Sequence, residues 1–475
     1  MRPTISNKII YIFSICFIVI NALLITYQFY WLTLLPIAVL LIGLTFFQLD
    51  KVLLIIAFFT PLSINLGDTD FGLALSLPTE PLLAGVLFLF FLKIIYERKY
   101  DFAIIKHPIS LAIIFSIFWN VLTSITSQLP VVSIKFIIAR LWFIVPFYFF
   151  GVLFFKKYAN IKRFLVFFLI PLCAVVLYTI VNHAAYGFNH ESAHWVMDPF
   201  FNDHTSYGAL LAMMFPLIIV LYKKKYSNTI KFLVLLATII LIAGIVLSYT
   251  RAAWLSLVVA LGVFLIYYFK INFKFLFIFG AIFLTLILAF KSDILMKLER
   301  NRQDSSNNMA EHIQSISNIN SDASNLERIN RWQSAFRMFY ERPFVGFGPG
   351  TYMFLYAPYQ HSTEKTIIST NAGTLGNAHS EYIGPLAEQG VFGTLAYIVI
   401  IFFVYYRGSL LYYSISDKDN KKLILAVLLG FTTYVVHGFI NNFLDTDKAA
   451  VPFWAFVAII TAMDIYHKKE LAVQE

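Results

Sequence analysis

Long apolar runs dominate this chain of 475 residues and constrain what it can fold into. They follow one another from Lys8 to Tyr466, with short polar segments between them. A helix needs about 20 apolar residues to cross a hydrocarbon core roughly 30 Å thick, and most of these runs approach that length. Only 13% of the residues are charged, whereas soluble domains carry about 25%. The sequence therefore predicts an all-α integral membrane protein.

The breaks between the apolar runs predict about fourteen transmembrane helices. Two breaks are weak, at 48–51 and at 250–251, so about twelve helices also fit the pattern. The first run follows Arg2 and Lys8 without a small-residue cleavage site after it, and we expect it to stay as the first helix. The predicted helices cover residues 8–27, 31–48, 51–65, 80–96, 108–127, 134–155, 163–181, 206–222, 231–249, 252–269, 274–290, 381–405, 422–441 and 450–467.

Basic residues gather in alternate loops. The short loops between them, such as 67–77 and 182–205, contain no Lys or Arg. Because cytoplasmic loops carry the excess of basic residues, this pattern predicts that both termini are cytoplasmic. The net charge of +10 then reflects topology and contact with anionic membrane lipids, and we expect no nucleic-acid partner. The basic groups are Arg98, Lys99 and Lys106; Lys156, Lys157, Lys162 and Arg163; Lys223, Lys224, Lys225 and Lys231; Lys270 and Lys274; Arg407, Lys418, Lys421 and Lys422; and Lys468 and Lys469.

Metal-binding patterns are weak in this sequence. Cys16 and Cys173 both lie in apolar runs, so we expect neither a disulfide nor a thiolate metal site. The outward segment 182–205 is rich in histidine and acidic residues, but their irregular spacing makes a metal site the weaker alternative. These residues are His183, His190, Glu191, His194, Asp198, Asp203 and His204.

The longest outward segment runs from Lys291 to Ala378 and has distinct parts. It begins with an Asn/Ser-rich stretch over residues 301–324. From 326 to 340, apolar side chains at helical spacing predict an amphipathic helix, which we expect to lie at the membrane surface. Arg342 and Pro343 end this helix, and a Gly/Pro-rich turn over 346–350 follows. The apolar side chains of the helix are Ile329, Trp332, Phe336 and Phe339.

Several ionisable residues stand out by their position. Arg251 opens a helix on the outward side, where short loops otherwise avoid basic residues. Lys135 and Arg140 lie inside the sixth predicted helix, where a buried charge is costly, so structural pairing and substrate binding are equally plausible roles. Arg328 and Arg331 lie on the amphipathic helix and could each place two donors on a phosphate, or could simply face solvent.

His379 lies just before the helix that re-enters the membrane. An imidazole is the side chain best suited to accept a proton near neutral pH, although an interfacial histidine can also merely cap a helix. The sequence His379-Ser380, nine residues, Gly390, two residues, Gly393-Thr394 resembles the periplasmic-loop signature of the O-antigen ligase family.

Two further elements carry the same resemblance. Arg251 and Leu255 are similar to the Arg-x-x-x-Leu element of that family, and the stretch from Glu327 to Tyr352 resembles the domain shared by ligases and polymerases. The resemblance covers about residues 200–400. We therefore expect N-terminal transmembrane helices over 1–200, ligase-like transmembrane helices over 201–290, a large periplasmic loop over 291–380 and C-terminal helices over 381–475.

The resemblance implies a GT-C-like glycosyltransferase in the bacterial inner membrane, with its active site on the periplasmic face. It implies an undecaprenyl-diphosphate-linked glycan as donor and a glycolipid of the lipid A-core type as acceptor. His379 would be the general base or orient the acceptor, and Arg251 and Arg328 would bind the diphosphate. Further substrate-binding candidates are Arg331, Arg140, Lys135, Asp203, His204 and Glu381.

The chemistry that we expect needs no cofactor. The donor carries its own leaving group, and guanidinium groups can stabilise its charge in place of a metal ion, since no carboxylate pair at metal-binding spacing accompanies them. A single displacement would invert the anomeric configuration.

Other functions fit the same features less well. A polymerase of the same superfamily or a protein O-oligosaccharyltransferase would use the same donor with another acceptor. A lipid-glycan flippase or transporter would be expected to carry ionisable groups at mid-membrane, whereas here polar residues gather at the outer edge.

Overall fold

The computed structural model describes residues 7–28, 31–36, 43, 48–66, 75–98, 100–222, 226–271, 285, 323–366, 369–370 and 376–467. Across these ranges it is helical, with one antiparallel pair of short strands, β1 (Ile64–Asn65) and β2 (Ser76–Leu77). Within the described ranges, nine helices are long and apolar enough to cross a membrane. The prediction of an all-α integral membrane protein is confirmed. The predicted helix 274–290 and most of the Asn/Ser-rich stretch 301–324 lie outside the described residues.

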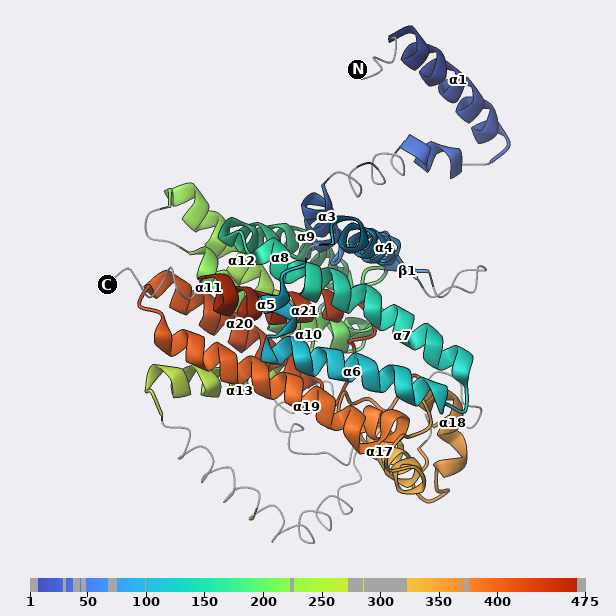
Figure 1. Ribbon diagram of the computed structural model, residues 1–475, viewed down its shortest axis with the longest axis vertical. Helices are drawn as coiled ribbons and strands as arrows, with labels where there is room; N and C mark the ends of the chain where they lie inside the picture. Colours follow the sequence, from blue (N-terminus) through green and yellow to red (C-terminus); the bar gives the residue numbers. More distant parts are fainter. Residues whose placement is uncertain are drawn as a thin grey trace. The chain divides into compact units, whose positions relative to one another are not determined.

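The chain divides into two compact units, Met1–Leu53 and Leu54–Glu475. The first contains α1 (Asn7–Thr26) and η1 (Trp31–Leu34), and α3 (Leu49–Phe59) runs across the boundary. The helices of the second unit are labelled in Figure 1. They are α4 (Thr79–Glu97), α5 (Phe102–Ile105), α6 (Pro108–Ile125), α7 (Pro130–Ile144), η2 (Val145–Phe150), α8 (Gly151–Phe155), α9 (Tyr158–Ala185), η3 (Ser192–His194), α10 (His204–Met214), η4 (Phe215–Leu217), α11 (Ile218–Leu221), α12 (Asn228–Leu247), α13 (Arg251–Tyr268), α17 (Ala323–Glu341), α18 (Tyr352–Leu355), η5 (Ala357–Tyr359), α19 (Ile383–Ser414), α20 (Lys418–His437), α21 (Asp447–Ala462) and η6 (Met463–His467).

Prolines interrupt two of the predicted helices. The run 134–155 forms α7 and α8, joined by the π-helical turn η2, which contains Pro146. The run 206–222 forms α10 and α11, joined by the 3-10 turn η4, which contains Pro216. Proline has no N–H to donate and displaces the carbonyl one turn earlier, so the hydrogen-bond pattern changes there. The apolar pattern alone shows each pair as one continuous helix.

The weak break predicted at 250–251 is a genuine separation of two helices. α12 ends at Leu247, Tyr249 adopts a positive φ of 50°, and α13 begins at Arg251. Thr250, between them, donates from its hydroxyl to the backbone carbonyl of His204 at 2.7 Å. The first turn of α13 is therefore tied to the first turn of α10.

The core of the second unit is formed by α20 and α21 with their neighbours. In the membrane-length span that begins with α21, 89% of the residues of its apolar window are buried inside the protein. α20 packs against α13 and α10. α19 packs along α6 and also against α17. A helix that is apolar all round is suited to such a central position.

The amphipathic helix predicted over 326–340 is present as α17. Its apolar side packs against the loop that follows it and against the start of α19, in a cluster that contains Ala335, Met338, Phe347, Tyr352 and Ala387. Trp332 and Phe336 of the predicted apolar side pack against this cluster and so bury part of their apolar area against protein. That the helix lies at the membrane surface stays a prediction.

Candidate active site

A break in α19 positions the loop that carries the candidate residues. Gly390 has a φ of 67°, and a Cβ atom there would lie 2.2 Å from the carbonyl oxygen of Phe344. Only glycine tolerates this conformation and this approach. The three carbonyls before the break accept hydrogen bonds from outside the helix: Ala387 from Phe347 N at 3.0 Å, Glu388 from Gly348 N at 2.8 Å, and Gln389 from Trp119 Nε1 at 2.8 Å.

The Gly/Pro turn is shaped to fit against that break. Gly346 has a φ of 64°, and a Cβ atom there would lie 2.3 Å from the backbone carbon of Glu388. The Glu388 side chain in turn accepts from Tyr352 N at 3.0 Å. The turn that follows α17 is therefore fixed to α19, and α17 is held beside the start of that helix.

His379 lies in a short polar segment at the start of α19. Its backbone φ is 47°, and its N–H donates to Asn377 Oδ1 at 3.0 Å. The next residue, Ser380, accepts from the backbone N–H groups of Tyr382 and Ile383 at 3.2 Å each and so caps α19. A left-handed histidine that its surroundings hold in place is the kind of backbone strain found at functional sites.

Arg331 contacts His379 directly. Its Nη1 lies 3.4 Å from His379 Nε2 and donates to the carbonyl of Asn377 at 3.1 Å. Its Nε donates to Glu327 Oε1 at 2.8 Å, one helical turn earlier in α17. The sequence pointed to Arg328 as the main cation of this helix and to Arg331 as its neighbour, whereas the structure gives Arg331 the direct contact with His379.

The surroundings of His379 favour its neutral form. Burial, together with the positive charges of Arg331 and Arg328, lowers the pKa of His379 to about 3, although the charges of Asp203 and Glu327 act in the opposite direction. The imidazole is therefore unprotonated at neutral pH and can accept a proton.

Glu327 keeps its charge in this cluster. Burial alone would raise the pKa of Glu327, but hydrogen bonds from Ser369, Arg331 and Thr366 lower it overall. The carboxylate thereby orients the Arg331 guanidinium and pairs with its charge.

Asp203 and His204 reach the same region from the start of α10. Asp203 caps α10 by accepting from the backbone N–H groups of Thr205 at 2.6 Å and Ser206 at 2.9 Å. The charge of Asp203 acts on His379, as does that of Arg328 on α17. His204 packs against His194 with ring centroids 4.1 Å apart. Arg251 begins α13, next to the Thr250 that bonds to His204, so it lies at the same end of these helices.

An open cavity of about 670 Å³ adjoins this cluster. Its walls come from the β1–β2 hairpin, residues 200–206, Asn377 and the 442–448 segment between α20 and α21. Asp203 lines this cavity, and Asn377 connects it to His379. We refer to it below as the acidic cavity.

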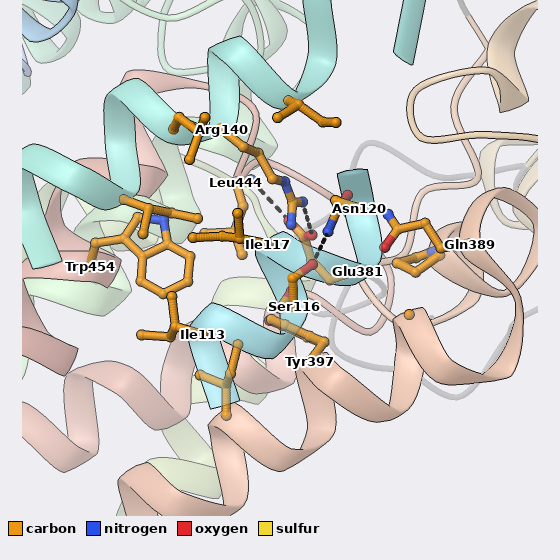
Figure 2. Close-up of a pocket in the computed structure, with 16 residues that line it drawn as sticks. Ile113, Ser116, Ile117, Asn120, Arg140, Glu381, Gln389, Tyr397, Leu444 and Trp454 are labelled. Carbon is orange, nitrogen blue, oxygen red and sulfur yellow. Dashed lines mark hydrogen bonds and ion pairs between the residues drawn. The ribbon is translucent and has the colours of Figure 1, made fainter. Parts of the chain in front are cut away.

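A second cavity, of about 630 Å³, surrounds Arg140 and Glu381 (Figure 2). Arg140 Nη2 lies 3.9 Å from Glu381 Oε2. The other carboxylate oxygen, Oε1, accepts hydrogen bonds from Tyr434 OH at 2.7 Å and from the backbone N–H groups of Phe443 and Leu444 at 2.9 Å each. Both residues were predicted to bind substrate, with structural pairing as an equal alternative for Arg140, and the contacts of Glu381 also hold the backbone of Phe443 and Leu444.

Polar atoms beside this pair lack protein partners. Within the described part of the chain, Asn120 Oδ1, Arg140 Nε and Tyr397 OH are buried without a hydrogen bond. Buried water commonly satisfies such groups. Lys135, also predicted to bind substrate, is exposed on α7 and lines neither cavity.

Comparison with known protein families identifies the region that holds the cluster. Residues 236–398 match the family model described as O-antigen ligase. This region of the chain is therefore similar to the O-antigen ligase family. No curated protein matched the chain. The matched region contains Arg251, Arg328, Arg331 and His379, so the family resemblance found in the sequence is confirmed for this region.

The matched region does not contain the whole site. Asp203 and the 442–448 segment lie outside its bounds but line the acidic cavity. Sequence reasoning missed Asn377 and the 442–448 segment. A signal was present at Asp447 and Lys448, since a charged pair at the start of an apolar run is uncommon.

Proposed function

We propose that this protein transfers a glycan from undecaprenyl diphosphate to a hydroxyl of an acceptor sugar. The acceptor is a glycolipid of the lipid A-core type, and the reaction takes place on the periplasmic face of the bacterial inner membrane. The match to the O-antigen ligase family supports a glycosyltransferase-like function. The observation that carries the proposal is the neutral His379 held 3.4 Å from the Arg331 guanidinium, with the charge of Arg328 nearby.

In the proposed reaction, the acceptor oxygen forms a bond to the anomeric carbon as the bond from that carbon to the diphosphate breaks. The acceptor proton passes to His379, and the configuration at the anomeric carbon inverts. Arg328, Arg331 and Arg251 stabilise the charge that develops on the leaving diphosphate. A positioned base typically contributes about 10²- to 10⁴-fold to the rate.

Donor binding would make His379 a better base. The two arginines that lower the pKa of His379 are the groups proposed to bind the diphosphate. Because the diphosphate offsets their positive charge, its arrival raises the pKa of His379 above its value in the free protein, while burial continues to lower it. Donor binding therefore makes His379 a stronger base.

Replacement of the base tests this proposal. The full-length protein is reconstituted in liposomes with an undecaprenyl diphosphate glycan and an acceptor glycolipid, and product formation is followed by mass spectrometry. We expect His379→Ala to lower the rate at least about 100-fold. The control is His361→Ala, an exposed histidine after η5. Wild-type rates in His379→Ala would remove the base assignment, and absence of transfer by the wild type would contradict the function.

The same assay identifies the acceptor. A product built on the lipid A-core glycolipid supports the ligase function, whereas elongation of a lipid-linked glycan would instead assign a polymerase of the same superfamily.

A further inference from the structure

The acidic cavity has the wrong charge for a diphosphate. The charged side chains among its described lining residues are Asp203, Asp445, Asp447 and Lys448. Lys448 donates to the carbonyls of Thr60 and Ser63 at 2.7 Å each, and it lies beside Asp447 in the sequence. The one positive charge of Lys448 offsets one of the three carboxylates, which leaves the described lining residues with a net negative charge. An anionic ligand would be repelled there.

Polar groups that line the cavity can accept hydrogen bonds from a ligand. Asn442 Oδ1 is buried and has no hydrogen-bond partner within the described part of the chain. Leaving such an acceptor unpaired costs about 1–3 kcal/mol, so a ligand hydroxyl there would be favourable. Carboxylates also accept from hydroxyl groups. The side chain of Asp445 is exposed on the cavity wall, where it can accept in this way.

Aromatic side chains complete the walls. Phe200, Phe201 and Phe443 line the cavity beside the amide and carboxylate groups. Ligand sites usually combine aromatic surface with a few well-placed polar groups, and the flat C–H face of a sugar ring packs on such surface while its hydroxyls meet the polar atoms.

We propose that the acidic cavity is the binding site of an uncharged acceptor sugar, and that its carboxylates exclude acidic sugars. The inference rests on the proposed function, because the cavity meets His379 through Asn377, whose Oδ1 holds the His379 backbone N–H. A sugar in the cavity presents a hydroxyl toward the base, while the diphosphate of the donor is held by the arginines of α17. The anionic donor and the uncharged acceptor thus bind at separate places that carry opposite charge.

Sugar binding can be measured without any transfer. The full-length protein in lipid nanodiscs is mixed with the methyl glycosides of glucose, galactose, N-acetylglucosamine and glucuronic acid, and saturation-transfer NMR reports binding. We expect at least one neutral glycoside to bind and the glucuronide to bind at least about fivefold more weakly. Asn442→Ala should weaken the neutral glycoside about fivefold, the loss of one hydrogen bond.

The Asp445→Asn variant tests whether the charge of Asp445 determines which sugars bind, an effect that a purely structural role of Asp445 would not produce. Removal of this charge should strengthen binding of the glucuronide relative to the neutral glycosides. Glu191→Gln removes an exposed carboxylate outside the cavity and should change neither. Equal thermal midpoints of the variants show that folding is retained.

The two proposals can fail separately. If the wild type transfers glycan but no neutral glycoside binds, or if binding is unchanged in both Asn442→Ala and Asp445→Asn, the sugar site is wrong and the function stands. If the glycosides bind as expected but no acceptor receives glycan, the sugar site stands and the proposed transfer fails.

Discussion

His379 is set apart from an ordinary surface histidine by three neighbours. Asn377 holds its backbone, Arg331 approaches its Nε2 atom, and Ser380 caps the helix that follows. Asn377 and Ser380 belong to the same short segment as His379, and Arg331 belongs to α17. The position of the imidazole therefore depends on side chains that do not themselves take part in proton transfer.

The pH dependence of the reaction should show how His379 is activated. kcat/KM reports the free protein, where the pKa of His379 is about 3, so kcat/KM should stay level from neutral pH down to about pH 5. kcat reports the donor complex, where the diphosphate raises that pKa, so kcat should fall at a higher pH than kcat/KM. Initial rates across a pH series measure both. A fall of kcat/KM centred near pH 6.5 would contradict the neutral, arginine-shielded histidine.

The arginines should not be replaceable by lysine. Arg331 donates at the same time to Glu327 and to Asn377, and lysine has no planar fork to reproduce this. We expect Arg331→Lys and Arg251→Lys each to lower kcat/KM about 10²-fold with normal membrane insertion. The control is Arg337→Lys on the same helix, whose partners are Glu364 and Tyr359. Near-normal turnover in both test variants would argue against bidentate diphosphate binding.

At the scale of elements, the break in α19 connects the loop to the bundle. The backbone carbonyls just before Gly390 accept hydrogen bonds from donors in the Gly/Pro turn and in α6. Gly390 of the family motif therefore has a structural role, because it lets two backbones approach closely, and the proposed chemistry is left to His379 and its neighbours.

Gly390→Ala should destabilise the fold. The new methyl group would meet the Phe344 carbonyl and would occupy a left-handed conformation, at a combined cost of at least about 2 kcal/mol. Thermal unfolding in detergent measures this as a lowered midpoint. The control is Gly262→Ala in α13, where nothing lies within 4 Å of the added methyl and helix propensity favours alanine. Equal midpoints for the two variants would mean that the close approach at Gly390 is not tight.

At the scale of the whole molecule, segments far apart in the sequence meet at one place. The β1–β2 hairpin, the start of α10, Asn377 and the 442–448 segment share the acidic cavity. The charge pattern predicts that all four lie on the same side of the membrane. Glu381 and Arg140 add a link between α7, the start of α19 and the loop that carries Phe443.

The contact between Arg140 and Glu381 predicts that the effects of their single substitutions on thermal stability do not add in the double variant. Arg140→Gln or Glu381→Gln alone leaves a partly buried charge without its partner, and each should lower the thermal midpoint. The double variant removes both charges while glutamine can keep some hydrogen bonds, so it should be more stable than the sum of the single effects predicts. Additive losses would show that the 3.9 Å contact contributes little.

Local patterns were enough to predict much of the fold. The apolar runs predicted the membrane class, and the helical spacing of Trp332 and Phe336 predicted α17 to within a few residues. Both are properties of neighbouring residues, which the sequence shows directly. The family motif likewise depends on spacing within one segment, and the match over residues 236–398 confirms the family that it indicated.

Only the tertiary structure decided which residues come together around His379. Arg328 and Arg331 lie less than one helical turn apart, and which of them contacts His379 depends on how α17 packs against α19. The partners of Glu381 come from α7, α20 and the loop that follows α20, and the walls of the acidic cavity come from elements hundreds of residues apart in the sequence. Such contacts depend on the packing of whole helices, because the hydropathy of a run predicts that it enters the membrane but not which neighbour it meets there.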